Sequence, residues 1–239
     1  MMVVGVALAV LGAATGLRAA DEKDAKVVLF NGKDLSGWKL RNPQLTKTWR
    51  VVSEVKLDQA NSKMLMGVGE GGAADAAMFR GPIDHGSDIM TEKEFGDCEM
   101  HIELMVPKDS NSGIYLMGQY EIQVLDSFGR PDNQLNMGDC GAIYSARVPT
   151  INASKAPGEW QTFDIVFRAP RFDAAGKKTD NGRFVSVVFN GKKIHENVEV
   201  KGGTGGQIGP EKATGPVMLQ GDHGIVAYRN IWIKPSEQK

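Results

Sequence analysis

The sequence predicts an all-β fold of two packed antiparallel sheets, and two observations predict it. Short segments that alternate apolar and polar residues recur along the chain, whereas no window of about 11 residues beyond the N-terminal run has an apolar stripe with helical spacing. Turn residues separate these segments, in keeping with 29 Gly and 10 Pro among 239 residues. Many short strands joined by turns form a sandwich or a jelly roll.

Eight segments have the alternation or the composition of strands. They are residues 49–57, 63–68, 98–106, 113–118, 120–126, 162–170, 183–190 and 228–235. The clearest turn is Asn190-Gly191, because both residues tolerate the positive φ of a type I′ hairpin. With no internal repeat to divide the chain, we expect one domain over residues 26–235.

The N-terminal run MMVVGVALAVLGAATGL is apolar, rich in small residues and followed by Arg-Ala-Ala. It is shorter than a bilayer-spanning helix and typical of a secretory signal peptide, although no Lys or Arg precedes it. We expect residues 1–20 to be this signal, a periplasmic or secreted protein, and no stable membrane insertion after cleavage.

Charge composition excludes one class of partner. Lys and Arg number 28 against 29 Asp and Glu, for a formal net charge of -1. Such a balance offers no basic footprint for nucleic acid or for an anionic membrane surface.

The two cysteines leave their pairing open. Cys98 and Cys140 could form a disulfide in an exported protein. Cys98, however, lies on the apolar side of the strand pattern of residues 98–106, which is typical of a buried free thiol.

Polar residues of three consecutive segments are expected to share one sheet face. Alternation groups Glu99, His101 and Glu103 in the first segment, Tyr115 in the second, and Glu121 and Gln123 in the third, with Asp126 just beyond. A solvated outer face is one interpretation. The other is a binding or catalytic site, because neighbouring carboxylates repel unless a ligand, proton or metal uses them. Glu99, His101 and Glu103 are also compatible with a divalent metal.

Residues 121–126, EIQVLD, resemble the E-I-D-x-x-E signature of laminarinase-type glucanases. A retaining glycosidase needs two carboxyls about 5 to 5.5 Å apart. Glu121 would be the nucleophile and Asp126 the acid. Gln123 and the shortened Asp126 depart from that signature and weaken this interpretation.

Four blocks spread over the chain resemble a second family. They are VVLFNGKDLSGW (27–38), TEKEFGDCEMHIEL with NSGIYLMGQYEIQVLDSFG (91–129), GEWQTFDIVFRAPRFDAAGKK (158–178) and GPVMLQGDHGIVAYRNIWIKP (215–235). Together they look like the 3-keto-disaccharide hydrolase family. The resemblance implies a concanavalin-like jelly roll, export, and cleavage of glycosides already oxidised to a ketone at C3.

The implied substrate suggests which groups the site needs. A C3 ketone acidifies the C2 proton, so a base can remove it and expel the C1 substituent, after which water adds. We expect Glu103, Glu121 and His223 to transfer protons. Residues expected to bind the sugar are Tyr115, Gln123, Asp126, Gln220 and His101. A divalent metal at the enolate oxygen stays open.

The closing segment LQGDHG (219–224) favours His223 over the other histidines. Gln220, Asp222 and His223 in this turn could reach over a concave face, whereas His195 is expected to face solvent. Because Gly221 is an insertion in this turn, the sequence does not determine whether His223 reaches the site. The Gly-rich residues 201–210 are expected to form a loop near the rim of the site. The alternative functions are a retaining β-glucanase and a non-catalytic sugar-binding module.

Overall fold

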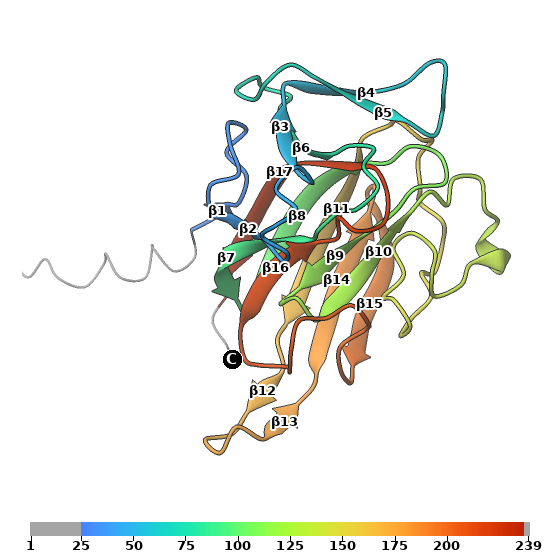
Figure 1. The fold of residues 1–239 in the computed structure, drawn as a ribbon. Coiled ribbons are helices and arrows are strands. Elements are labelled where there is room, and N and C mark those ends of the chain that lie inside the picture. Colours follow the sequence, from blue (N-terminus) through green and yellow to red (C-terminus); the bar gives the residue numbers. More distant parts are fainter. Residues whose placement is uncertain (1–24, 237–239) are drawn as a thin grey trace, which may run out of the picture.

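The computed structural model describes residues 25–236, which form a sandwich of two antiparallel sheets (Figure 1). The expected signal peptide, residues 1–20, lies outside the described residues. Among residues 25–236 no helix is long and apolar enough to cross a bilayer. The predicted all-β jelly-roll sandwich is confirmed.

One sheet has eight strands. Its order is β15 (Lys192–Val200), β14 (Gly182–Phe189), β11 (Gln161–Arg168), β8 (Cys98–Met105), β17 (Val226–Pro235), β6 (Ala77–Arg80) and β3 (Arg50–Val52), and β1 (Val27–Val28) pairs with β17. The first and last described strands are thus hydrogen-bonded neighbours.

The other sheet has five strands. Its order is β10 (Tyr120–Leu125), β9 (Asn111–Leu116), β16 (Gly215–Leu219), β7 (Ile89–Phe95) and β2 (Trp38–Leu40). Two hairpins project from opposite ends of the sandwich, β4 (Glu54–Leu57) with β5 (Leu65–Val68) and β12 (Arg171–Phe172) with β13 (Lys178–Asp180) (Figure 1). A 3₁₀ turn at Asp132–Gln134, η1, completes the assigned elements.

The core fills the space between the two sheets. Alternate residues of β8 point inward, and Met100, Ile102 and Leu104 are fully buried. Phe163 and Phe189 from neighbouring strands stack at 4.2 Å between ring centroids. Each large apolar side chain buried in this way contributes roughly 1.5–3 kcal/mol to folding.

The chain changes sheets between β8 and β9. The connection Val106–Ser110 contains Pro107, which has no N–H for a ladder, and Asp109, whose φ is 60°. In consequence β8 pairs with β11 and β17, and β9 pairs with β10 and β16. The expectation that three consecutive strands share one face is therefore wrong for the first of them.

Cys98 and Cys140 are both free and buried. Burial raises the pKa of each thiol to about 12. The structure favours the buried-thiol interpretation over the disulfide.

A candidate active site on the five-stranded sheet

Polar side chains form one row across the face of the five-stranded sheet that points away from the core. Antiparallel register places Gln123 of β10 opposite Gly113 of β9. Gln220, just after β16, donates its backbone N–H to the Gly113 carbonyl. Arg41, just after β2, donates its backbone N–H to the carbonyl of Asp88, just before β7. Ladder pairing thus brings residues far apart in sequence to one surface.

Glu121 and Tyr115 form the next row on the same face. They are directly opposite in the β9–β10 register, and both side chains are buried, with exposures of 3% and 2%. A Cβ added at Gly113 would lie 2.2 Å from Glu121 Oε1. The carboxyl therefore occupies space that is open only because residue 113 is glycine.

Burial perturbs both groups of this pair. Loss of solvent raises the pKa of Glu121 to about 7, against the opposing effect of a hydrogen bond from the Tyr115 hydroxyl. Burial and the neighbouring Glu121 also raise the pKa of Tyr115, so the phenol stays neutral. A carboxyl that titrates near pH 7 is suited to exchanging protons with a substrate.

Three amide oxygens around Glu121 have no partner. They are buried, and they accept no hydrogen bond from any atom of the described chain: Asn111 Oδ1, Gln123 Oε1 and Gln220 Oε1. All three residues line a cavity of about 310 Å³ together with Glu121. Buried polar atoms in native structures are normally satisfied, so these three oxygens are available to accept hydrogen bonds from a ligand with hydroxyl donors.

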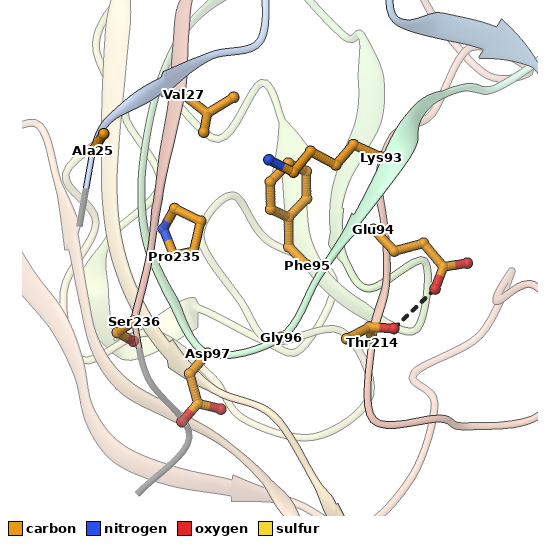
Figure 2. Close-up of a pocket in the computed structure, with 10 residues that line it drawn as sticks. All are labelled: Ala25, Val27, Lys93, Glu94, Phe95, Gly96, Asp97, Thr214, Pro235 and Ser236. Carbon is orange, nitrogen blue, oxygen red and sulfur yellow. Dashed lines mark hydrogen bonds between the residues drawn. The ribbon is translucent and has the colours of Figure 1, made fainter. Parts of the chain in front are cut away.

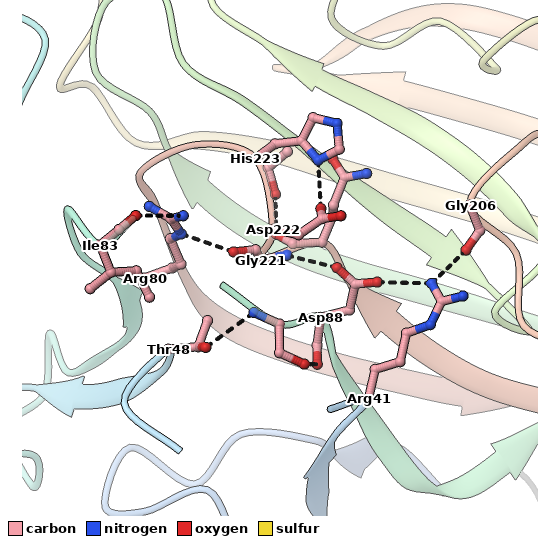
Figure 3. A network of polar contacts seen from close by, with 12 residues as sticks. Arg41, Thr48, Arg80, Ile83, Asp88, Gly206, Gly221, Asp222 and His223 are labelled. Atoms are coloured by element: carbon pink, nitrogen blue, oxygen red, sulfur yellow. Dashed lines mark hydrogen bonds and ion pairs between the residues drawn. The ribbon is translucent and has the colours of Figure 1, made fainter. Parts of the chain in front are cut away.

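The connection between β16 and β17 carries His223 (Figure 3), and this residue lines the cavity. Gly221 is held from both sides, because its N–H donates to Asp88 Oδ1 at 3.0 Å and its carbonyl accepts from Arg80 Nε at 2.9 Å. A Cβ on Gly221 would lie 2.3 Å from the Ser87 carbonyl oxygen. The inserted glycine thus fixes the turn against the sheet, and His223 does reach the cavity.

His223 has one ring nitrogen engaged. Its Nδ1 lies 2.5 Å from Asp222 Oδ1, and both side chains are about half exposed. Because the carboxylate favours a proton on Nδ1, Nε2 is the nitrogen that can exchange a proton with a ligand at the rim.

The Gly-rich loop forms another wall, as expected. Gly205 and Gly206 line the cavity. The Gly206 carbonyl accepts a hydrogen bond from Arg41 Nη1 at 2.8 Å, and the same guanidinium contacts Asp88 Oδ2 at 3.1 Å (Figure 3). Arg41 therefore ties the loop to the sheet while it presents a positive charge to the cavity.

Glu103 and His101 lie elsewhere, on the outer face of the eight-stranded sheet. Glu103 accepts hydrogen bonds from Arg229 and Asn230, each at 2.7 Å. His101 stacks on Trp232 and its Nδ1 lies 2.7 Å from Asp164. Strand alternation assigned their side of β8 correctly, but it did not show that β8 belongs to the other sheet.

Two further expectations are corrected in detail. Asp126 is not among the residues that line the cavity, and its carboxylate accepts the backbone N–H groups of Asp109 and Phe128. His195 is buried rather than exposed, with Nε2 donating to the Gly141 carbonyl at 2.7 Å. A register shift between Val187 and Val188 of the partner strand is the reason why His195 turns inward beside Ile194.

The described residues hold no ready-made cluster of metal ligands. Within residues 25–236 no group of three or more His, Cys, Asp or Glu side chains is arranged to hold one. Amides surround the Glu121 carboxyl, and amide oxygens suit sugar hydroxyls as acceptors. Glu99, His101 and Glu103 lie on the other sheet.

A separate cavity of about 420 Å³ lies where the two ends of the described chain meet (Figure 2). Its carboxylates are already engaged, because Glu94 accepts from Thr214 and Asp97 accepts from Arg171 and from the Ala169 N–H. It lacks the unpartnered buried amides that distinguish the site around Glu121.

Sequence reasoning missed several members of the site. Arg41, Asp88, Asn111 and Tyr144 also line the cavity. Arg41 and Asp88 stand just outside strands β2 and β7. Only the sheet order, which is not local in sequence, brings them beside Glu121.

Comparison with known proteins identifies the family. Residues 25–234 match the family described as the 3-keto-alpha-glucoside-1,2-lyase-like domain. The chain belongs to this family. It is accordingly a carbohydrate-active, glycosyl hydrolase-like protein.

Individual relatives support the same class of carbohydrate-active protein. A solved structure from Parabacteroides distasonis, a candidate glycosyl hydrolase, is 32% identical with a TM-score of 0.64, and the match covers 88% of this chain and 84% of that one. A second from the same species, 19% identical with a TM-score of 0.60 over 93% and 99% of the two chains, shares the fold.

A curated relative from Bacteroides thetaiotaomicron is named 3-keto-disaccharide hydrolase. It is 25% identical over 169 residues, which cover 61% of this chain and 53% of the relative. The chain therefore spans about half the length of that relative.

Proposed function

We propose that the protein cleaves the glycosidic bond of 3-keto glycosides by elimination followed by hydration. One observation carries the proposal: a carboxyl whose pKa is raised to about 7 by burial is surrounded by three buried amide oxygens without partners. The carboxyl supplies a base and the amides suit a polyhydroxylated ring. The family description and the name of the curated relative both refer to 3-keto sugars, which supports this substrate class.

In the elimination, the Glu121 carboxylate takes the C2 proton. The electron pair of the C–H bond forms the enolate, with negative charge on the C3 oxygen. The enolate then collapses to the ketone, a C1–C2 double bond forms, and the C1–O bond breaks. The leaving oxygen receives a proton, for which His223 Nε2 at the rim is the donor.

In the hydration, His223 Nε2, which gave up its proton in the elimination, takes a proton from water as the water oxygen bonds to C1. The electron pair of the C1–C2 double bond returns to the enolate, which then takes the proton from Glu121 at C2 as the C3 ketone re-forms. The net reaction is hydrolysis, and no covalent enzyme intermediate is needed. Arg41 is the cation suited to stabilising the enolate oxygen, because it lines the cavity. The neutral Tyr115 phenol orients Glu121 through their hydrogen bond.

The two alternative functions have less support. A retaining glucanase built on the EIQVLD segment would use Asp126 beside Glu121, and Asp126 does not line the cavity. A purely binding module has no use for a carboxyl that titrates near neutral pH.

The test is product analysis by mass spectrometry with a 3-keto disaccharide and its unoxidised parent. We expect cleavage of the keto substrate alone. Glu121→Gln should lower kcat by at least about 100-fold, because the amide cannot act as a base. Glu103→Gln, a matched carboxyl on the other sheet, should leave kcat unchanged. Cleavage of the parent sugar would favour the glucanase, and binding without cleavage would favour the module.

We also propose that residues 1–20 direct export to the periplasm or beyond the cell. The apolar run followed by small residues supports this. Expression of the full chain should yield a mature N-terminus at Asp21, measurable by N-terminal sequencing. An intact Met1 in the exported fraction, or retention in the cytoplasm, would contradict it.

A further inference from the structure

A second cavity adjoins the candidate active site. It has a volume of about 350 Å³ and is lined by residues 144–146 and by residues 199–204. Tyr144 lines this cavity and also the one that contains Glu121. The two cavities are of similar size, and the Tyr144 side chain is the wall that they share.

The same loop borders both cavities. Gly202, Gly203 and Thr204 line the second cavity, and Gly205 and Gly206 line the first. Gly202 carries no side chain and a Cβ there would meet open space, so a ring-shaped ligand can approach the backbone closely at this residue.

Thr204 connects the second cavity to the proposed base. Its Oγ1 accepts the backbone N–H of Glu121 at 2.8 Å, although Thr204 itself lines the second cavity. A ligand there would contact the residue that fixes the backbone of Glu121. The lining of the second cavity is thus hydrogen-bonded to the backbone of Glu121.

The lining chemistry suits a sugar ring. Tyr144 is 36% exposed, so part of this aromatic residue is open to a ligand. Lys201 and Glu199 add charged groups that can bond hydroxyls, although Glu199 already accepts from Asn181 and Arg183. An exposed aromatic ring with flanking polar groups is a common sugar platform.

We propose that this second cavity binds the leaving group of the 3-keto glycoside, and that its preferred occupant is another sugar ring. The proposal rests on the proposed function, because it assigns the 3-keto ring to the cavity with Glu121. The C1–O bond would then lie beside Tyr144, between the two rings. The protein would be selective for disaccharides over glycosides with small leaving groups.

Gly202 allows a sharp test. It lines the second cavity, has no positive φ, and a Cβ added there would meet no described atom within 4 Å. Gly202→Phe should therefore place a large side chain at the cavity without backbone strain. Gly202→Ala is the matched control, because it makes the same backbone change and leaves the cavity open.

The experiment measures kcat and KM for a 3-keto disaccharide and for a methyl 3-keto-glucoside. We expect Gly202→Phe to lower kcat/KM for the disaccharide about tenfold and to leave the methyl glycoside unchanged. Gly202→Ala should match the wild type on both. Tyr144→Ala should lower disaccharide kcat/KM more than that of the methyl glycoside, which checks the shared wall in a second variant.

Two results would overturn the proposal: an equal loss on both substrates, or no loss on either, in a Gly202→Phe protein that melts like the wild type. If the wild type cleaves neither keto substrate, the proposed function fails and binding becomes the readout. Saturation-transfer NMR with the unoxidised disaccharide should then show weaker binding to Gly202→Phe than to Gly202→Ala. Equal binding would refute the second cavity as a sugar site.

Discussion

Burial of Glu121 links the proposed chemistry to protein stability. Its pKa rises from an ordinary 4.5 to about 7 because the side chain is removed from solvent. The folded chain therefore keeps a proton that the unfolded chain has released between these two pH values. Folding stability should fall as pH rises through this window, by about 3 kcal/mol for this group alone.

The Glu121→Gln variant tests this pH dependence against the wild type. Because Gln does not titrate, the variant should gain free energy of unfolding relative to the wild type between pH 4.5 and pH 7, and hold that gain above it. Urea unfolding at pH 4.5 and pH 7.5 measures this difference. An equal difference at both pH values would contradict the raised pKa. In wild-type kinetics, kcat/KM should rise with pH through about 7 as Glu121 deprotonates.

Gly113 makes the position of this carboxyl possible. A methyl group there would overlap Glu121 Oε1 at 2.2 Å, so Gly113→Ala should displace the carboxyl. We expect a loss in kcat of about tenfold to 100-fold, since misplacement by about 1 Å has effects of this size. Gly138→Ala is the control, because a Cβ there meets only Asn136 Oδ1 at 3.3 Å. Equal activity of the two variants would show that the position of Glu121 does not depend on residue 113.

At the scale of elements, the β16–β17 connection is held in place by hydrogen bonds, and it positions His223. The backbone of Gly221 is gripped by the Asp88 carboxylate and the Arg80 guanidinium, and both of these side chains are buried. Gly86 packs so closely that a Cβ on it would lie 1.9 Å from the Gly221 carbonyl oxygen. Because these buried contacts surround Gly221 on three sides, the backbone of the turn is held in a single conformation.

Gly221→Ala should therefore move the turn. We expect lower thermal stability and a fall in kcat of about tenfold or more, because His223 would leave its place at the rim. Gly138→Ala again provides the comparison, as both glycines lack a positive φ. Thermal melts and steady-state kinetics measure the two effects. An unchanged kcat would remove His223 from the proton-transfer role.

Strand alternation correctly predicted which side chains lie on the same face of a strand. It did not predict to which of the two sheets a strand belongs. Tyr115, Glu121 and Gln123 share a face, as predicted, because the β9–β10 hairpin is local in sequence. Glu103 was placed with them because its own strand alternates equally well. The five-residue connection that moves the chain to the other sheet has no periodic signal, so sequence reasoning could not detect it.

At the scale of the whole molecule, the sandwich separates the polar residues into two sets. The five-stranded sheet carries buried polar groups without partners, whereas on the eight-stranded sheet Glu103 is satisfied by Arg229 and Asn230. Burial would raise the pKa of Glu103, but these hydrogen bonds lower it. Under the proposed function, the same residue types serve recognition on one sheet and stability on the other.

Glu103→Gln should accordingly cost stability rather than activity. Loss of the charge-assisted bonds should cost about 1–3 kcal/mol at pH 7. The lowered pKa means that this contribution is present above the ordinary value and is lost as pH falls through the folded value. Chemical unfolding at pH 7 and pH 3 measures it. A large fall in kcat without destabilisation would instead return Glu103 to the catalytic set.

The fold class could be predicted from the sequence, but the membership of each strand in one sheet or the other could not, and the site was predicted only in part. Alternation and turn residues sufficed for the sandwich. His223 and Gln220 followed from one Gly-flanked turn, whereas Arg41 and Asp88 required the strand order β16–β7–β2. Residues that meet only through non-local pairing leave no spacing in the chain by which to find them.

The two buried cysteines allow local and global opening of the fold to be measured by chemical labelling of their thiols. Both thiols are protonated at neutral pH and shielded by the core, so alkylating reagents and oxidants should not reach them while the sandwich is closed. Cys98 is in β8 of the eight-stranded sheet, and Cys140 is in the loop that connects β10 to β11. Their labelling rates would therefore distinguish separation of the two sheets from local opening of the loop, without any added probe.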